Sequence, residues 1–474
     1  MGRMTESGEG AAGLTAADAR ALAASLRGLV EQAAAIVDQD GVAAPLVAKV
    51  CGHLGCDITE VLSVVSKFEV WEHVNLQRGV NAYLAAHTPE AEWFGLSGQQ
   101  RGREDLVGMI VAARYQRTHG LGAADYATAA VGPDESVEVV QLGMAPTRAP
   151  DGTPVLVGVQ GYNEYGAPAC RLEVIAADRA TARAVGTEIE RLMRLHDAFR
   201  GQVLAFGVSE HRGNELLTFL PRPVLGPDDV VLPEGVLESI EHHVVGVAEH
   251  AERLRAAGQH LKRGLLLHGP PGTGKTHTVR YLMSRLPGCA VILLTGPAMR
   301  LINQAVALAR RLQPSMLVVE DVDLVAMDRA RSHGGNPLLF ALLDAMDGVG
   351  ADADVTFVLT TNRADELEGA LADRPGRVDL AVEVPRPDAD GRLRLLRLYG
   401  RGVDLRADLA PVVEATEGVT ASFIKELLRR AVLEAVRAGG DGTPVVGDEL
   451  LELTRSMTDE RRSLTGALLG GKLG

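Results

Sequence analysis

The second half of the chain alternates between short apolar runs and longer segments of helical character. Each run has the length of a β-strand, and continuous apolar sequence is typical of a strand buried on both faces. The alternation therefore predicts an α/β fold, in which a parallel sheet is covered by helices on both faces. The five runs are Leu265–His268, Ala290–Thr295, Met316–Val319, Val355–Thr360 and Leu380–Val384.

The strand signals stop after Pro385-Arg386-Pro387, and a helical pattern replaces them. In the clearest helix, which begins at Ser422, apolar residues recur every three to four positions and charged residues occupy the opposite side. We therefore expect a sheet-containing subdomain at residues 226–386 and a small helical subdomain at 387–474. The apolar stripe consists of Phe423, Ile424, Leu427, Leu428, Ala431, Val432, Ala435 and Val436.

The first 225 residues carry two different patterns. Residues 1–14 are polar and rich in glycine, which predicts a disordered tail. From Thr15 onward apolar residues recur at helical spacing, with interruptions, as far as Ala113, and this predicts a helical module at 15–125. A small α/β module is predicted at 126–225. Its strand-like runs are 137–142, 155–160, 171–176 and 203–206, with one helix before the last of them.

Composition places the chain among globular proteins. Its 474 residues suffice for about three domains, and 46% of them are hydrophobic. No apolar run is long enough to span a bilayer, the start lacks a signal-peptide core, and Glu6 stands where a myristoylation site needs Ser or Thr. We therefore expect a soluble cytoplasmic protein without a membrane span. Few lysines beside many Arg, Ala and Gly residues favour a GC-rich bacterial genome as the source.

The formal net charge of −14 argues against a nucleic-acid partner, because an acidic surface repels phosphate backbones on average. No basic run interleaved with aromatic residues offsets this charge. The composition therefore disfavours a nucleic-acid motor.

The segment from Cys51 to Cys56 also contains His53, and these three side chains could hold a metal ion. No second pair of ligands lies nearby in the sequence, however. Apolar residues at helical spacing flank the segment, which favours thiols packed in a helix core over a metal site.

A glycine-rich segment directly follows the first apolar run and fits the pattern G-x-x-x-x-G-K-[ST]. Its glycines let backbone N–H groups turn toward a triphosphate, Lys275 supplies a positive charge to the β- and γ-phosphates, and Thr276 offers a hydroxyl to Mg²⁺. Strand, loop and helix occur in the required order, which disfavours an incidental glycine turn. The candidate ATP-binding residues are Gly269, Pro270, Pro271, Gly272, Thr273, Gly274, Lys275, Thr276 and His277.

Polar side chains follow two later apolar runs at the point where each run ends. Glu320 and Asp321 come after Met316–Val319, so that one carboxylate could hold Mg²⁺ and the other could orient the attacking water. Asn362 comes after Val355–Thr360, where its amide could contact both the γ-phosphate and that water. Ligands bind at the carboxyl ends of parallel strands, so these side chains predict a hydrolytic site beside the glycine-rich loop.

Two arginines, Arg374 and Arg377, lie on a proline-containing turn further along the chain. Guanidinium groups suit the charge that develops on a transferred phosphoryl group, because their planar donors match phosphate oxygens. We therefore count both arginines as candidate catalytic residues.

The order of these motifs resembles that of the AAA ATPases, which belong to the AAA+ superfamily. Asn336–Leu339 and Met346-Asp347-Gly348 fit the same pattern, and the resemblance covers about the last half of the chain. It implies a P-loop core with a helical lid and an Mg²⁺-dependent ATPase that assembles into a homo-oligomeric ring, usually a hexamer. It also implies that Asn362 is the sensor-1 residue, that Lys275, Glu320 and Asp321 are catalytic, and that Arg374 and Arg377 act as arginine fingers on the neighbouring subunit's ATP.

Two features depart from the usual pattern of that family. Most members carry Asp-Glu where this chain has Glu320-Asp321, which makes the metal carboxylate longer and the base shorter by one methylene. The acid order, and the Arg263-Gly264 pair before the first strand, are similar to those of the mitochondrial translocase of the Rieske iron-sulfur protein. The second departure lies at residues 296–302, where protein-threading members usually place an aromatic pore loop and this chain has no aromatic residue.

Two other functions are therefore favoured over a nucleic-acid motor. The first is an oligomeric ATPase that remodels protein substrates or complexes and selects its target through residues 1–225. The second is a nucleotide-switched scaffold, which assembles with ATP and hydrolyses it slowly without unfolding a substrate. The unusual acid order and the missing aromatic residue keep the second hypothesis open.

Overall fold

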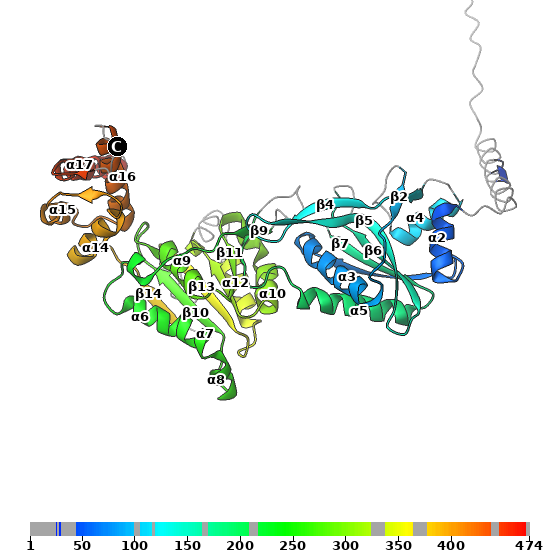
Figure 1. Ribbon diagram of the computed structural model, residues 1–474. Helices are drawn as coiled ribbons and strands as arrows, with labels where there is room; N and C mark the ends of the chain where they lie inside the picture. Colours follow the sequence, from blue (N-terminus) through cyan, green and yellow to red (C-terminus); the bar gives the residue numbers. More distant parts are fainter. Residues whose placement is uncertain are drawn as a thin grey trace, which may run out of the picture. The chain divides into compact units, whose positions relative to one another are not determined.

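A computed structural model gives the structure of the chain (Figure 1). The predicted tail at residues 1–14 and nearly all of the helix predicted from Thr15 lie outside the residues that it describes. Side chains are not described at 337–340, 445 and 462–470. The described residues are 44–98, 105–115, 119–163, 169–207, 217–323, 337–363, 377–437 and 445–470, with isolated positions at 25, 28 and 29.

The chain divides into two compact units, of which the first contains residues up to Thr128 and Glu138–His196. A five-stranded sheet forms the centre of this unit. In spatial order the strands are β1 (Leu62–Phe68), β7 (Cys170–Ala176), β6 (Pro154–Gln160), β5 (Ser136–Arg148) and β4 (Asp125–Ala130). In this sheet β1 pairs with β7, β7 with β6 and β6 with β5, all in the antiparallel direction. Two further short strands, β2 (Gly95–Ser97) and β3 (Gly120–Gly122), form a separate antiparallel sheet.

Helices cover both faces of the five-stranded sheet, as β6 illustrates. Val155, Val157 and Val159 pack with residues of α3 and α5, whereas Leu156 packs with residues of α2 and α4. Alternate residues of a strand point to opposite faces, so a strand with both sets buried lies between two helical layers. The helices are α2 (Pro45–Leu54), α3 (His73–His87), α4 (Leu106–Tyr115) and α5 (Arg179–Leu195), with a 3₁₀ turn at Val70–Glu72.

This unit differs from the two modules predicted for the N-terminal half. β1 lies within the predicted helical module 15–125, yet it pairs with β7 of the predicted α/β module, with Val64 opposite Val174. Conversely, β8 (Val203–Phe206) was expected in that α/β module and instead pairs with a strand of the second unit. The physical reason is that strand pairing joins segments far apart in sequence, which a local pattern does not reveal.

The second unit contains a seven-stranded sheet, and the predicted α/β core with a parallel sheet is confirmed. The five expected strands are mutually parallel, β8 extends them in parallel, and β9 closes one edge in the antiparallel direction. The spatial order is β14 (Leu380–Glu383), β10 (Arg263–His268), β13 (Val355–Thr361), β12 (Ser315–Val319), β11 (Ala290–Leu294), β8 and β9 (Leu217–Leu220).

The faces of this sheet are covered in the same alternating manner. Leu265 and Leu267 of β10 pack with Val279 of α9, and Ile240 of α6 belongs to the same cluster. A second group of helices consists of α10, which contacts β11 and β12, and α12, which contacts α10. The helices of this subdomain are α6 (Val236–Glu241), a π-helical turn (His242–Gly246), α7 (Val247–Glu249), α8 (Ala251–Ala256), α9 (Lys275–Arg285), α10 (Ile302–Arg311) and α12 (Pro337–Asp347), with 3₁₀ turns at Pro227–Asp229 and Gly296–Leu301.

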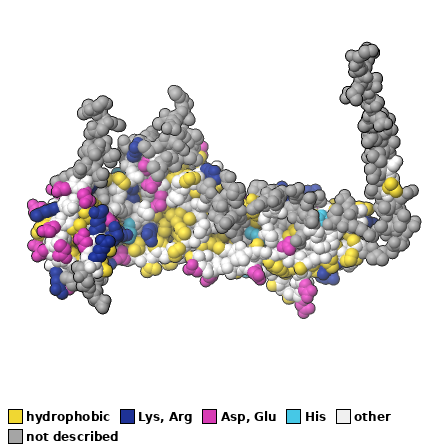
Figure 2. Space-filling model, turned by 90° about the horizontal axis from the view of Figure 1, so that it is seen from above, with side chains coloured by type: hydrophobic (Ala, Val, Ile, Leu, Met, Phe, Trp, Pro, Cys, Tyr) yellow, Lys and Arg dark blue, Asp and Glu magenta, His cyan; other side chains and the backbone are white. Residues whose placement is uncertain are grey.

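A helical subdomain follows the last strand. Asp388 begins it by capping the first helix, because its carboxylate accepts from the N–H of Gly391 at 2.7 Å. Figure 2 shows acidic and basic side chains mixed on this part of the molecule, which is consistent with ion pairs such as Arg429–Glu426. Its elements are α14 (Ala389–Tyr399), α15 (Leu409–Ala415), α16 (Ala421–Arg437), α17 (Glu449–Gly470) and a two-stranded sheet of β15 (Asp404–Leu405) and β16 (Val445–Val446).

Among the described residues, none of the helices is both long enough and apolar enough to cross a lipid bilayer.

Candidate active site

The strand order brings the candidate residues to one edge of the sheet. β13 lies between β10 and β12, and all three strands run in the same direction. The carboxyl end of β10 leads to the glycine-rich loop, that of β13 to Asn362 and that of β12 to Glu320. The amide of Asn362 is therefore placed between the loop on one side and the carboxylates on the other.

The glycine-rich loop needs glycine at three positions. Gly269, Gly272 and Gly274 have φ angles of 138°, 77° and 118°, which other residues rarely adopt. At Gly269 a Cβ would also lie 2.3 Å from the backbone oxygen of Val384, so a side chain has no room there. The loop leads directly into α9, whose N-terminal N–H groups suit an anion.

The Lys275 side chain turns back into this loop. Its ammonium donates to the backbone oxygens of Gly269 at 2.8 Å and Pro270 at 3.0 Å, and to Oδ1 of Asn362 at 2.8 Å. The residue is 6% exposed, and burial lowers the pKa of the ammonium, while the nearby Asp321 and Asp323 act in the opposite direction. The cation is thus held at the mouth of the phosphate-binding loop.

Asp321 has an unusual backbone conformation. Among the described residues it is the one non-glycine position with a positive φ, at 50°. Thr360 stabilises this turn, because its hydroxyl oxygen accepts from the N–H of Asp321 at 3.0 Å. Strained backbone of this kind concentrates at functional sites, and here it directs the carboxylate that follows β12.

Asn362 connects the cation to the acid. Its Oδ1 accepts from Lys275, and its Nδ2 donates to Oδ1 of Asp321 at 3.2 Å. Glu320 is partly exposed beside them and continues the strand, since its N–H donates to the oxygen of Leu294 at 3.1 Å. The structure therefore brings together four of the six residues predicted to be catalytic.

The structure describes only Arg377 of the two predicted arginines. Arg374 lies outside the described residues. Arg377 is 5% exposed and forms a bidentate ion pair with Asp347, at 3.0 Å from Nε and 2.6 Å from Nη2, and this pair raises the pKa of the guanidinium. Its role toward a neighbouring subunit remains a prediction that would require this pair to open.

His277, predicted with the loop, turns its imidazole elsewhere. Its Nε2 lies 2.8 Å from the backbone oxygen of Asp229, which precedes the sheet-containing subdomain's first helix. The imidazole is therefore a structural contact of α9 in this conformation. Thr276, in contrast, is exposed at the end of the loop.

Sequence reasoning missed two contributors to the site. Asp323 is buried, and its Oδ1 accepts from the hydroxyl of Thr361 and from the N–H of Asn362. Val322 and Asp323 are both helical and both buried, so no strand-like alternation of the sequence marks Asp323 as part of the site.

The second missed feature is a pocket of about 300 Å³ beside the loop. It lies where Thr273 of the loop, the segment before α6 and the helical subdomain meet. The N–H of Ser422, at the start of α16, donates to the oxygen of Gly272 at 3.0 Å and fixes the helical side of this region. The lining comes from Thr273 and from three other stretches of the chain, namely Val231–Glu234, Pro385–Asp388 with Asp390, Gly391, Arg394 and Leu395, and Ala421.

His53, in the Cys51–Cys56 segment, contacts the protein backbone. Nε2 of His53 lies 3.0 Å from the backbone oxygens of both Thr147 and Val155. Burial raises the pKa of both thiols. Within the described ranges no group of three or more His, Cys, Asp or Glu side chains is arranged to hold a metal ion.

Comparison with known proteins agrees with this geometry. Residues 265–386 match the family described as "ATPase family associated with various cellular activities (AAA)". The chain is 34% identical over 264 residues to the ATP-dependent zinc metalloprotease FtsH 2 of Symbiobacterium thermophilum, which covers 51% of this chain and 43% of that protein. It is 32% identical over 230 residues to the proteasome-activating nucleotidase of Pyrococcus furiosus, which covers 46% of this chain and 58% of that protein.

The chain thus carries an AAA domain at residues 265–386. It spans about half the length of these curated relatives. The particular similarity to the mitochondrial Rieske-protein translocase remains an expectation from the acid order.

Proposed function

We propose that this chain is a Mg²⁺-dependent ATPase that works as a homo-oligomer and remodels protein substrates or complexes. The observation that carries the proposal is the hydrogen-bonded series Lys275–Asn362–Asp321 at the end of three adjacent parallel strands. It joins a phosphate-binding cation, an amide and a carboxylate within direct contact, which is the set that phosphoryl transfer to water needs.

In this mechanism the triphosphate lies along the glycine-rich loop and the N-terminus of α9. Lys275 exchanges its contacts with Gly269 and Pro270 for contacts with the β- and γ-phosphate oxygens. Asn362 orients the attacking water, and a carboxylate oxygen of Asp321 accepts its proton. Since the side chain of Asp321 is one methylene shorter than the usual glutamate, we expect slow turnover.

The residues at the loop end fit a magnesium ion. Thr276 offers an exposed hydroxyl and Glu320 a partly exposed carboxylate, and oxygen donors of this kind suit Mg²⁺. Mg²⁺ retains waters and binds phosphate oxygens, so it does not require a cluster of three acidic or histidine ligands. When bound, the ion would neutralise charge on the β- and γ-phosphates.

The pocket beside Thr273 is the site that we assign to the base and ribose of the nucleotide. Its walls belong to both subdomains, and Ser422 of the helical subdomain bonds directly to Gly272. The helical subdomain therefore acts as the lid. A nucleotide in this position would couple its own hydrolysis to the angle between lid and core.

The arginines support an oligomer, which we propose to be a hexameric ring. Arg374 and Arg377 would act on the ATP of the neighbouring subunit, and Arg377 would first have to leave Asp347. Protein substrates are favoured by two relatives, whose names refer to a protease and to the activation of a proteasome. We assign target selection to residues 1–225, whose first unit has its own sheet and core.

A slow nucleotide-switched scaffold is the second candidate. It is favoured by the acid order and by residues 296–302, where Ala298 and Met299 are buried and no aromatic side chain is present to grip a threaded chain. Addition of a candidate protein target would separate the two functions. Stimulated phosphate release supports remodelling, and nucleotide-dependent assembly without stimulation supports the scaffold.

The ATPase proposal is tested with Asp321→Asn. This variant should bind ATP as tightly as the wild type and release phosphate at least about 100-fold more slowly, because the proton acceptor is lost. Asp352→Asn is the matched control, since Asp352 is exposed in the turn that precedes β13, at the opposite end of the strand from Asn362. Equal turnover in Asp321→Asn and the control would remove Asp321 from the reaction.

A further inference from the structure

Two hydrogen bonds join the segment that follows β12 to the end of β13. Thr360 accepts from the N–H of Asp321, and Thr361 donates its hydroxyl to Oδ1 of Asp323 at 3.0 Å. Asp323, Thr360 and Thr361 are at most 4% exposed. These hydrogen bonds are therefore shielded from water and define the relative position of the two strand ends.

Asp323 has a second contact on the same oxygen. Its Oδ1 also accepts from the backbone N–H of Asn362 at 3.1 Å. One carboxylate oxygen thus fixes the backbone of Asn362, while the side chain of that residue bridges Lys275 and Asp321. Among the described residues, Asp323 contacts Asn362 at the backbone N–H and not at the side-chain amide that orients the water.

We propose that Asp323 is a positioning residue for ATP hydrolysis, which acts by holding the backbone from which the Asn362 amide reaches Lys275 and Asp321. This inference rests on the proposed ATPase function. Loss of the contact would let Asn362 move, and a displacement of about 1 Å at a reacting group can cost on the order of 100-fold in rate. Nucleotide affinity would change little, because the loop and Lys275 remain.

The test compares Asp323→Ala, Asp323→Asn and Asn362→Ala in the full chain, with kcat and KM for ATP measured by phosphate release. Asp323→Ala should lower kcat by about 10- to 100-fold and leave KM within about threefold. Asp323→Asn keeps an oxygen acceptor at the same place and should recover most of the lost rate. Asp352→Ala, a truncation of an exposed acid, is the control for removal of a carboxylate.

A double-mutant cycle distinguishes positioning from a separate catalytic role. If Asp323 acts through Asn362, then Asp323→Ala should slow the Asn362→Ala enzyme by less than about threefold. A full additive loss would overturn the proposal. Wild-type kcat in Asp323→Ala would also overturn it, as would a defect in Asp323→Asn as deep as that in Asp323→Ala.

A further variant covers the case in which Asp323→Ala does not fold. Thr361→Val removes one of the two donors to Asp323 and keeps the size of the side chain, so it should lower kcat without a change in KM. An unchanged kcat in Thr361→Val, with Asp323→Ala unfolded, would reduce Asp323 to a stability role and overturn the proposal. A wild-type enzyme that releases no phosphate would instead overturn the ATPase function itself.

Discussion

Replacement of Lys275 by methionine removes one charge and leaves the apolar part of the side chain nearly unchanged. In the structure the ammonium has three acceptors at 2.8–3.0 Å, two of which are backbone oxygens of the loop and the third Oδ1 of Asn362. A triphosphate would take the place of the loop oxygens. The variant loses these phosphate contacts, while the loop keeps its glycines and its connection to α9.

The expected loss of affinity follows from these contacts. Hydrogen bonds that involve a charged partner contribute about 1.5–3 kcal/mol each. Two such bonds to charged phosphate oxygens, at about 3 kcal/mol each, replace two bonds to neutral backbone oxygens, at about 1.5 kcal/mol each, which leaves a net contribution of about 3 kcal/mol. That difference corresponds to roughly a 150-fold increase in Kd.

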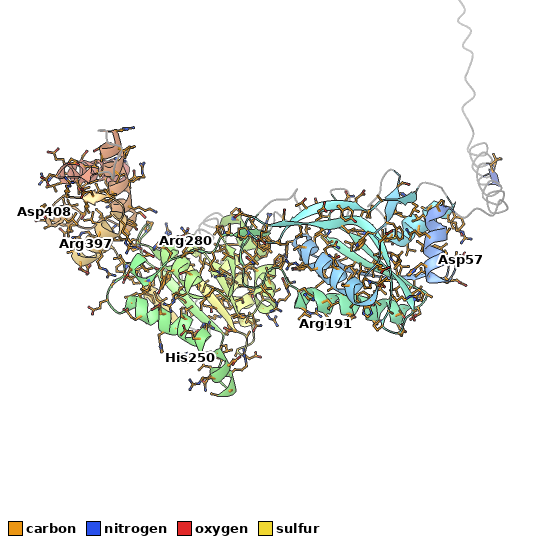
Figure 3. All side chains as sticks on the ribbon, in the orientation of Figure 1. Asp57, Arg191, His250, Arg280, Arg397 and Asp408 are labelled. Atoms are coloured by element: carbon orange, nitrogen blue, oxygen red, sulfur yellow. The ribbon has the colours of Figure 1, made fainter. Side chains whose placement is uncertain are left out.

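The assay is a titration of Mg-ATP into the purified variant, followed by calorimetry or by a fluorescent nucleotide. Arg280→Met is the matched control, because Arg280 is an exposed cation on the same helix, α9 (Figure 3). It should bind ATP within about threefold of the wild type, since exposed charges interact weakly through water. Equal Kd values for Lys275→Met and the wild type would refute the reasoning.

Three further predictions concern the scaffold of the site. Gly269→Ala should abolish ATP binding in a folded protein, because the new Cβ would meet the oxygen of Val384 at 2.3 Å. Asp354→Ala should lower the free energy of unfolding by about 3–5 kcal/mol, as it leaves the buried guanidinium of Arg263, 2.9 Å away, without its partner. Glu426→Gln should reduce the acid sensitivity of the lid. Hydrogen bonds from Arg429 and Arg430 lower the pKa of Glu426 to about 2. The ionised Glu426 therefore adds to the free energy of unfolding in full above its ordinary pKa of about 4.3, and this contribution is lost as the pH falls toward 2.

These three predictions have separate readouts. Nucleotide titration together with thermal unfolding checks Gly269→Ala, and tight binding would contradict the close approach of β14. Urea unfolding checks Asp354→Ala, and a loss below about 1 kcal/mol would mean that water reaches Arg263. Thermal unfolding at pH 5 and pH 3 checks Glu426→Gln, which should show a smaller difference between the two pH values than the wild type.

The sequence signals for the candidate site are local. Gly269–Thr276, Glu320-Asp321 and Asn362 each follow an apolar strand, and parallel strands deliver such ends to one edge. The structure adds the order of the strands, which puts Asn362 between Lys275 and Asp321. That adjacency depends on pairing between strands about 40 to 90 residues apart in the chain, and periodicity does not encode it.

The features that escaped prediction are non-local. The pairing of β1 with β7 joins segments about 100 residues apart, so β1 was assigned to a helical module. Arg377 is buried in an ion pair with Asp347, although we expected it to face a neighbouring subunit. The sequence motif does not predict this pair. The pocket beside Thr273 needs three separate stretches of chain. Each of these depends on tertiary packing and not on local pattern.

The proposed ATPase function requires that the Lys275–Asn362–Asp321 series performs hydrolysis. The decisive measurement is steady-state phosphate release from ATP by the wild type and by Asp321→Asn, each with Mg²⁺ and with EDTA. The account predicts release by the wild type only when Mg²⁺ is present, and tight ATP binding with almost no release by the variant. Equal release by both proteins, or release by the wild type that EDTA does not reduce, would contradict it.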